Sequence, residues 1–262
     1  MTDAPAAETA ARPAARVDAL YRYPVKALSP ERLSRVTLTT GAMMPFDRAY
    51  AIENGPGRFD AQAPRHLPKV TFLTLMRDER AATLDTTFDD ATETLTISRG
   101  GKQVARGQLT TKLGRTLIEQ FLAAYMKAEL RGAPRIVSAP GHSFSDVAAK
   151  CLHIVNLASL RELERAAGRP IDPLRFRPNV IVDGVPPWAE FDWVGKDLKL
   201  GSARVCGLVR TQRCAATNVD PGTGHRDMAI PAILERTWGH TDFGIYASVI
   251  ADGTVAIGDA LE

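Results

Sequence analysis

The sequence predicts a mainly β protein of the α+β class, with an N-terminal β-barrel-like domain and a C-terminal β-barrel domain that carries a few short helices. Short apolar stretches recur along the chain, turn-forming residues separate them, and few segments show helical periodicity. The chain has 262 residues, enough for two cores, because domains commonly contain about 100 to 150 residues. We predict a disordered tail over residues 1–15, a first domain over 16–135 and a second over 136–262.

Strand patterns dominate the first half, and glycine-rich or aspartate-rich turns such as Gly100-Gly101 separate them. The predicted strands are Val17–Tyr23, Leu33–Leu38, Arg48–Ile52, Val70–Met76, Ala82–Thr86, Thr94–Ser98 and Gln103–Leu109. A helix follows, capped by Thr110 or Thr111. Its apolar residues, which we interpret as core packing, are Leu113, Leu117, Phe121, Leu122 and Tyr125.

Residues 131–140 are interpreted as the connection to a second β-rich half. A strand at Cys151–Val155 precedes a helix at Leu160–Ala167, which Gly168 and Pro170 end. The remaining strands are predicted at Val180–Val182, Asp197–Leu200, Ala203–Thr211, Tyr246–Ile250 and Thr254–Ile257, with a short helix near Ile230–Arg236.

Composition excludes several classes of protein. The formal net charge is +3 and basic residues are scattered, so neither a nucleic-acid partner nor a membrane partner is expected. No apolar stretch approaches 18 residues, and the N-terminus lacks the apolar segment of a signal peptide. Three cysteines leave at least one thiol unpaired, which favours a reducing, cytoplasmic location.

The most informative segment runs from Arg213 to Gly224. Cys214 follows an arginine, comes after the apolar run Val205–Val209 and precedes the turn-forming Asp220-Pro221-Gly222. Such a thiol is expected at a strand end, in a cationic and partly open site where a thiolate is stable. A buried structural cysteine is the alternative for a thiol taken alone.

Several separated motifs together resemble one family. Residues 175–179, 213–224, 243–246 and 255–259 resemble the MOSC domain of molybdenum cofactor enzymes. Residues 23–26 and 46–48 resemble the N-terminal β-barrel domain that accompanies MOSC in the mitochondrial amidoxime-reducing component and its bacterial relatives. The resemblance spans about residues 16–262, in family order.

The resemblance implies a bound molybdenum cofactor (Mo-molybdopterin), with Cys214 as catalytic residue and metal ligand. A soft thiolate suits molybdenum held by a pterin dithiolene. The positions that match cofactor contacts are Lys26, Arg48, Asn156, Arg177, Asn179 and Tyr246. Arginine and lysine suit the pterin's phosphate, and an amide suits its ring edge. The family is also associated with pyridoxal phosphate binding, for which no residue is assigned here.

The resemblance further implies two-electron reduction of N-hydroxylated substrates, such as hydroxylamines, amidoximes or N-hydroxylated bases, with the oxygen leaving as water. Three cysteines cannot hold an iron–sulfur cluster, and no dinucleotide-binding glycine motif is present. A separate ferredoxin, flavodoxin or haem protein is therefore the expected electron donor. A cofactor-binding or sulfur-carrier protein, with a persulfide on its cysteine, is the alternative function.

Several assignments stay open in the sequence. Asn156 can cap a helix or contact phosphate, and Tyr246 can contact the cofactor or pack in a strand. Asp220 suits a turn as well as a site-orienting role, and Arg213 can be solvated. Arg177 precedes Pro178, so extended backbone is expected there.

Three further assignments concern residues near the expected site. Ala27 stands where the family often has a hydroxyl residue. Cys151 and Cys206 are interpreted as core thiols. A cysteine hydrolase pairing Cys214 with His225 or His240 remains formally open.

Overall fold

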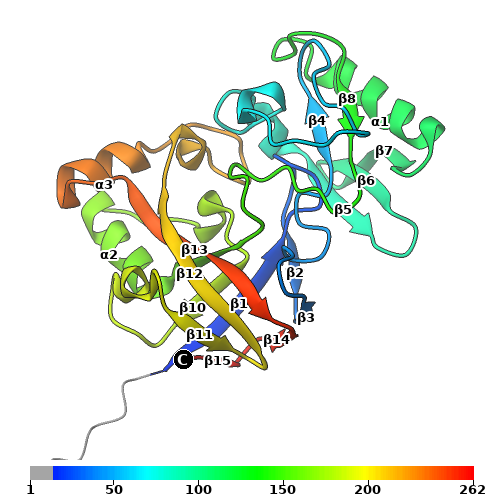
Figure 1. Cartoon of the computed structure of the whole chain (residues 1–262). Coiled ribbons are helices and arrows are strands. Elements are labelled where there is room, and N and C mark those ends of the chain that lie inside the picture. Colours follow the sequence, from blue (N-terminus) through cyan, green and yellow to red (C-terminus); the bar gives the residue numbers. More distant parts are fainter. Residues whose placement is uncertain (1–13) are drawn as a thin grey trace, which may run out of the picture.

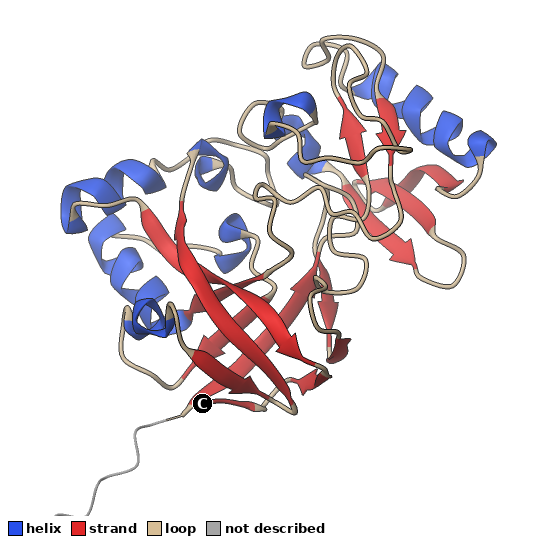
Figure 2. Cartoon of the chain, in the orientation of Figure 1, coloured by secondary structure: helices blue, strands red, loops and turns tan. Residues whose placement is uncertain are grey.

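A computed structural model describes residues 14–262 (Figure 1). The mainly β fold predicted from the sequence is confirmed, and long strands run through the larger part of the molecule (Figure 2). The predicted tail over residues 1–15 lies outside the described residues up to position 13, and Ala15 already begins the first strand. Among residues 14–262, no helix combines the length and the apolar character needed to cross a membrane.

The larger part is a closed β-barrel. Its strands follow the order β10-β9-β13-β12-β11-β15-β1, and β1 pairs again with β10, which closes the sheet. The strands are β1 (Ala15–Arg22), β9 (Leu152–Asn156), β10 (Val180–Asp183), β11 (Asp197–Leu200), β12 (Ala203–Gln212), β13 (Asp242–Ala251) and β15 (Ala260–Leu261). The first strand of the chain thus completes a barrel whose other strands all come from the second half.

Alternating burial along β1 explains this position. Val17 and Leu20 are buried in the barrel core with Ile154, Val182 and Val205. Two short strands that follow β1 in the chain also pair with barrel segments. Strand β2 (Glu31–Leu33) pairs with β1, and β3 (Arg35–Leu38) pairs with β14 (Gly253–Ala256). Helices α2 (Leu157–Ala167) and α3 (Ile230–Trp238) pack together beside the barrel over a second apolar cluster.

The smaller part lies at one end of the barrel and has its own core (Figure 1). An antiparallel sheet of β5 (Asp85–Asp89), β6 (Thr94–Arg99) and β7 (Lys102–Gln108) packs against α1 (Lys112–Tyr125). A separate pair joins β4 (Ala51–Glu53) to β8 (Arg135–Val137).

The predicted helix after β7 is confirmed, and its packed face agrees with the prediction at Phe121, Leu122 and Tyr125 but not at Leu113 and Leu117. Thr111 caps α1 by accepting a hydrogen bond from the Gly114 amide at 3.0 Å. Leu113 is 70% exposed and Leu117 45%, whereas Ile118 and Leu122 are buried. A Cβ on Gly114 would lie 2.1 Å from a backbone oxygen of β7, so the glycine lets this face of the helix meet the sheet.

One predicted strand before β5 is wrong and a second begins too early. The segment predicted as Val70–Met76 contains part of the 3-10 helix η1 (Lys69–Thr71) and a turn. Of the segment predicted as Ala82–Thr86, the first two residues belong to η2 (Glu79–Thr83), and the last two begin β5. The buried Asp78 carboxylate accepts the Thr74 amide at 2.8 Å. A side chain that binds nearby backbone competes with strand pairing, and here it holds the turn.

Candidate functional site

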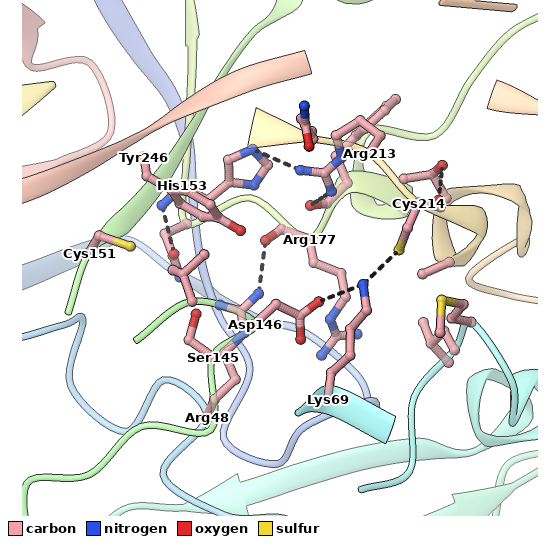
Figure 3. Close-up of a pocket in the computed structure, with 18 of the residues that line it drawn as sticks. Arg48, Lys69, Ser145, Asp146, Cys151, His153, Arg177, Arg213, Cys214 and Tyr246 are labelled. Carbon is pink, nitrogen blue, oxygen red and sulfur yellow. Dashed lines mark hydrogen bonds and ion pairs between the residues drawn. The ribbon is translucent and has the colours of Figure 1, made fainter. Parts of the chain in front are cut away.

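A cavity of about 880 Å³ lies where the end of the barrel meets the smaller part. Both halves of the chain line it, and the residues around its centre come from separate loops and strands (Figure 3). Seven of its lining residues are lysine or arginine and three are aspartate: Lys26, Arg48, Lys69, Arg175, Arg177, Arg210 and Arg213, against Asp47, Asp146 and Asp242. The cavity is therefore suited to an anionic ligand.

Cys214 lies in the wall of this cavity, directly after β12, as the sequence predicts for a strand end. The residue is half-buried and begins the 3-10 helix η5 (Ala215–Asn218), in which the Thr217 amide and hydroxyl both donate to the Cys214 carbonyl oxygen. Its Sγ accepts a hydrogen bond from Lys69 Nζ at 3.4 Å (Figure 3). The thiol thus faces a cation, in a fixed position, on a cavity surface.

Arg48 and Arg177 form the opposite part of the cationic wall. Arg48 Nη2 donates to the Arg177 carbonyl oxygen at 3.1 Å, and both guanidinium groups stack on the buried Tyr23 ring, with distances to its centroid of 4.6 and 4.0 Å. Burial and the neighbouring Arg48 lower the pKa of Arg177 to about 10. This arrangement concentrates positive charge away from bulk water, where an anion gains most from it.

The predicted extended backbone at Arg177 is wrong. Arg177 has φ 52° and ends the 3-10 helix η3 (Pro173–Phe176), because its amide bonds to the Leu174 carbonyl oxygen. Arg48 also has a positive φ, of 50°. Left-handed backbone costs a non-glycine residue about 1–2 kcal/mol, and such strain gathers at functional sites.

Lys26 enters the cavity wall from the loop after β1. Its Nζ donates to the Phe144 carbonyl oxygen at 2.8 Å and forms an ion pair with Asp146. Burial lowers the pKa of Lys26, an effect that Asp146 opposes. Although burial raises the pKa of Asp146, the charges of Lys26 and Lys69 bring it down to about 2.

Sequence reasoning missed Lys69 and Asp146. Lys69 Nζ lies 3.8 Å from Asp146 Oδ2, so one lysine connects this carboxylate to the Cys214 thiol. Lys69 falls in a segment that resembles a strand edge, and Asp146 in a stretch without periodic pattern. Only their meeting in the fold identifies them.

Arg213 turns its side chain into the cavity rather than into solvent. Its guanidinium donates to the Phe176 carbonyl oxygen at 2.8 Å and lies 3.3 Å from His153 Nε2. Burial and the Arg213 charge hold the pKa of His153 well below 6.5. The neutral imidazole therefore accepts this hydrogen bond, and His153 is a further lining residue that the sequence did not single out.

Two more predicted residues line the cavity, and they differ in whether their polar groups are already hydrogen-bonded. The Asn179 amide is occupied by backbone, because its oxygen accepts from the His153 amide and its nitrogen donates to Tyr21. Tyr246 lies on β13, with its ring 5.5 Å from that of His153. Asn179 thus orders the wall, whereas Tyr246 presents a side chain to the cavity (Figure 3).

Asn156 is the one predicted contact residue that the structure does not bring to the cavity. Its side chain caps α2 by accepting the Ala158 amide, and it donates to Glu190 at 3.0 Å. Ser159 also donates to this carboxylate, at 2.7 Å. Of the two roles open in the sequence, the structure selects helix capping, because the helix begins at Leu157 and not at Leu160.

Glu190 is buried without a basic partner among residues 14–262, which leads to a prediction. Burial raises its pKa above the ordinary 4.5, so the folded state binds this proton more tightly than the unfolded state. Its destabilising effect therefore grows as pH rises above about 4.5 and fades as pH falls. We expect Glu190→Gln to raise the free energy of unfolding at pH 8 relative to wild type, with the gain shrinking toward pH 4.5.

Urea unfolding of both proteins across that pH range measures the effect. Glu190→Ala is the control, because it removes the acceptor of Ser159 and one of the two acceptors of Asn156. It should cost about 1–3 kcal/mol at pH 4.5, and the cost should shrink toward pH 8 because the alanine variant also lacks the buried charge. An equal stability difference between wild type and Glu190→Gln at pH 4.5 and pH 8 would contradict the prediction.

Asp220 fills the turn role and also braces the loop of Cys214. Its Oδ1 accepts the amides of Gly222 and Thr223, while its Oδ2 accepts from the buried Arg175 at 2.9 Å. Arg175 donates in addition to the carbonyl oxygen of Asn218, the last residue of η5. The segment after Cys214 is thereby attached to η3, which carries Arg177 at its end.

The other two cysteines differ from each other. Cys151 is buried, lines the cavity across from Cys214, and has a pKa raised by burial to about 12 (Figure 3). Cys206 is half-buried on β12 and does not line the cavity. His225 and His240 also lie outside the cavity wall, so the structure offers no support for a Cys214–histidine hydrolase.

One thiol alone does not complete the coordination of a metal ion, so it suits a metal whose other ligands belong to a cofactor. Among residues 14–262, no three histidine, cysteine, aspartate or glutamate side chains gather into a metal site. Arg177 Nη2 and Arg213 Nε are buried donors without a hydrogen-bond partner. Unused donors beside a thiol fit an anionic cofactor that brings its metal with it.

Two protein-family models match this chain. The model of the MOSC N-terminal beta barrel domain matches residues 14–131, and that of the MOSC domain matches residues 140–262. The YUAD protein from Bacillus subtilis, a solved structure, is 16% identical with a TM-score of 0.45, over 94% of this chain and 93% of that one.

Curated relatives match a shorter stretch. Mitochondrial amidoxime reducing component 2 of Homo sapiens is 32% identical over 120 residues, which is 41% of this chain and 35% of that protein. Molybdenum cofactor sulfurase of Oryza sativa subsp. japonica is 32% identical over 81 residues, 29% of this chain and 10% of the relative. The chain thus spans about a third or less of these relatives. Their names refer to amidoxime reduction and the molybdenum cofactor, not to pyridoxal phosphate.

The two matched domains cover nearly all of the described residues, in the order in which they follow one another along the chain. The motif residues around Cys214 and Arg177 lie within the second domain, and those around Lys26 and Arg48 within the first. This chain is a member of the MOSC family, with a MOSC N-terminal beta barrel domain followed by a MOSC domain.

Proposed function

We propose that this protein is a molybdenum cofactor-dependent oxidoreductase that reduces N-hydroxylated compounds such as hydroxylamines and amidoximes. The observation that carries the proposal is that one cavity unites the Cys214 thiol with two guanidinium groups, those of Arg177 and Arg213, that form no ion pair, whereas Arg48 and Arg175 pair with aspartates. Within residues 14–262, neither Arg177 nor Arg213 has an acidic group within 4.0 Å, although both are cavity residues. Such charges need an anion to compensate them.

The residues present fit the cofactor as follows. Cys214 would hold the molybdenum, while Arg48, Arg177 and Arg213 would hold the pterin's phosphate through charge-assisted hydrogen bonds. Lys26 and Lys69 add positive charge, and Tyr246 offers a hydroxyl group to the same cavity. The bound cofactor would supply a two-electron redox centre.

The protein's own residues then act on the substrate and its protons. Reduction of an N-hydroxyl group consumes two electrons and two protons, and it releases the amine and water. Asp146 has a pKa of about 2 and thus stays ionised at neutral pH, so it accepts hydrogen bonds without storing a proton. Lys69 and Lys26 are the ammonium donors in contact with it.

Electrons would come from a separate protein such as a ferredoxin, flavodoxin or haem protein. The sequence has three cysteines, and the structure shows all of them as free thiols. Protein carrying molybdenum should therefore turn over an amidoxime with a chemical reductant, or with a reductase and carrier, but not with NADH alone. Turnover with NADH alone would contradict the proposal of a separate donor.

Metal and pterin content test the main proposal. Protein from a host that makes the cofactor should hold close to one molybdenum and one pterin per chain. The alternative, a sulfur carrier with a persulfide on Cys214, predicts cyanide-releasable sulfur and no retained molybdenum. A preparation without metal or pterin that is active in sulfur transfer would replace the proposal by this alternative.

Arg177→Gln is expected to weaken the affinity for the cofactor by about 10- to 150-fold, because a desolvated charge-assisted hydrogen bond contributes about 1.5–3 kcal/mol. Cofactor occupancy should fall as a result. Lys26→Ala and Arg48→Ala should lower occupancy in the same direction. Pterin content at limiting cofactor measures the effect. Arg204→Gln is the matched control, since Arg204 is an exposed partner of Asp197 outside the cavity. Unchanged pterin content in all three cavity variants would show that the cofactor binds elsewhere.

A further inference from the structure

The cavity has a second region whose chemistry differs from that of the cationic cradle. Phe191, Val194, Val209 and Arg210 line it on the side that β12 and the 3-10 helix η4 (Ala189–Trp193) provide. Val209 is 52% exposed and Val194 36%, which is unusual for two valines on the same cavity wall. None of these four residues belongs to the predicted cofactor contacts, and most of their surface is apolar.

Arg210 is a charge fixed in this apolar wall. Its guanidinium carbon lies 4.3 Å from the centroid of the Phe191 ring, a stacking distance that restrains the side chain. Among residues 14–262, no carboxylate lies within 4.0 Å of it. In the register of β12 and β13, Arg210 lies opposite Ile245 and Gln212 lies opposite Asp242. The guanidinium of Arg210 is therefore held in place without an ion pair, and Glu190, the buried carboxylate whose pKa it lowers, lies farther than 4.0 Å from it.

The two regions are close enough for one small molecule to reach both. Arg210 and Cys214 are four residues apart, so their Cα atoms are at most about 14 Å apart even in a fully extended chain. Val209 pairs with Tyr246, whose side chain lies in the central part of the cavity. The apolar wall thus runs from the central cavity toward Arg210.

We propose that this region is a substrate subsite for an apolar or aromatic group that carries a carboxylate or another anionic substituent. This inference rests on the proposed function, because it places the N-hydroxyl end of the substrate near Cys214. Phe191, Val194 and Val209 contact the apolar body, and Arg210 forms the charge-assisted hydrogen bond with the distal anion. The preferred substrates are N-hydroxylated acids with a rigid apolar spacer.

Three compounds test the subsite in protein loaded with cofactor: hydroxylamine, benzamidoxime and benzamidoxime with a para-carboxylate. Wild-type protein should show a higher kcat/KM for the carboxylate compound than for benzamidoxime. Arg210→Gln should lower kcat/KM for the carboxylate compound about tenfold or more, the effect of one charge-assisted hydrogen bond. Values for benzamidoxime and hydroxylamine should stay within about twofold, as expected for an exposed position.

Arg204→Gln, on the same strand but outside the cavity, is the matched control and should leave all three values unchanged. Calorimetric binding of the reduced product, para-carboxybenzamidine, gives a readout without turnover, and Arg210→Gln should weaken it by the same factor. Hydroxylamine turnover by wild type tests the proposed function separately. If the carboxylate gives no advantage in turnover or binding, or if Arg210→Gln keeps that advantage, the subsite is refuted even where hydroxylamine is reduced.

Discussion

Cys214→Ser is expected to lower the rate of molybdenum-dependent amidoxime reduction per chain by more than about 100-fold, while the protein stays folded. Removing an outer-shell partner of a metal site typically costs about 10–100-fold, so loss of the ligand itself should cost more. The side chain is half-buried at a strand end, and a serine hydroxyl can still accept the hydrogen bond from Lys69. Turnover per chain, molybdenum content and thermal unfolding measure the three parts of this prediction.

Cys206→Ser is the control for the loss of a thiol, because Cys206 is half-buried on β12, the strand that precedes Cys214, and lies outside the cavity. It should keep activity within about twofold. Cys151→Ser should also retain activity, apart from a destabilisation of about 1–3 kcal/mol for burying a hydroxyl. A Cys214→Ser variant with bound molybdenum and full activity would remove Cys214 from the role of ligand.

Deletion of residues 1–22 is expected to abolish folding of the barrel, which is the largest effect on stability that we predict. The deletion removes β1 and opens the barrel between β10 and β15. Burial of Val17 and Leu20 alone is worth about 3–6 kcal/mol, at about 1.5–3 kcal/mol for each side chain. Total stabilities are about 5–15 kcal/mol, so the open barrel, with two unpaired edges, should not persist. Near-ultraviolet circular dichroism and hydrogen exchange of the truncated chain measure the outcome.

A circular permutant and a shorter deletion make this test specific. Ala15 pairs with Leu261, so a short linker from residue 262 to residue 14 can restore β1 in a chain that begins at residue 23. That permutant should fold, and a chain lacking only residues 1–13 should fold as well. A folded barrel in the chain that lacks residues 1–22 would show that β1 is dispensable.

Local patterns in the sequence identify most elements correctly, and the failures have a common cause. The strands β6, β11, β12 and β13 follow from apolar runs between turns, because such runs bury side chains wherever they pair. Residues 70–76 carry a similar apolar pattern, yet the Asp78 carboxylate holds them in turns. The buried face of α1 was predicted only in part, because the contact of Gly114 with β7 depends on a strand that is adjacent only in space.

The sequence by itself determined the mainly β fold class and the family, and it predicted the place of Cys214 at a strand end, because motifs and periodic patterns are local properties of a chain. The tertiary structure decided which charges share a cavity. Lys69, Asp146 and His153 come from three separate segments. Strand pairing within the barrel brings His153 to Arg213, and packing of the smaller part against the barrel brings Lys69 to Cys214 and Asp146. The same packing kept Asn156 away, because its side-chain hydrogen bonds are satisfied within α2 and by Glu190.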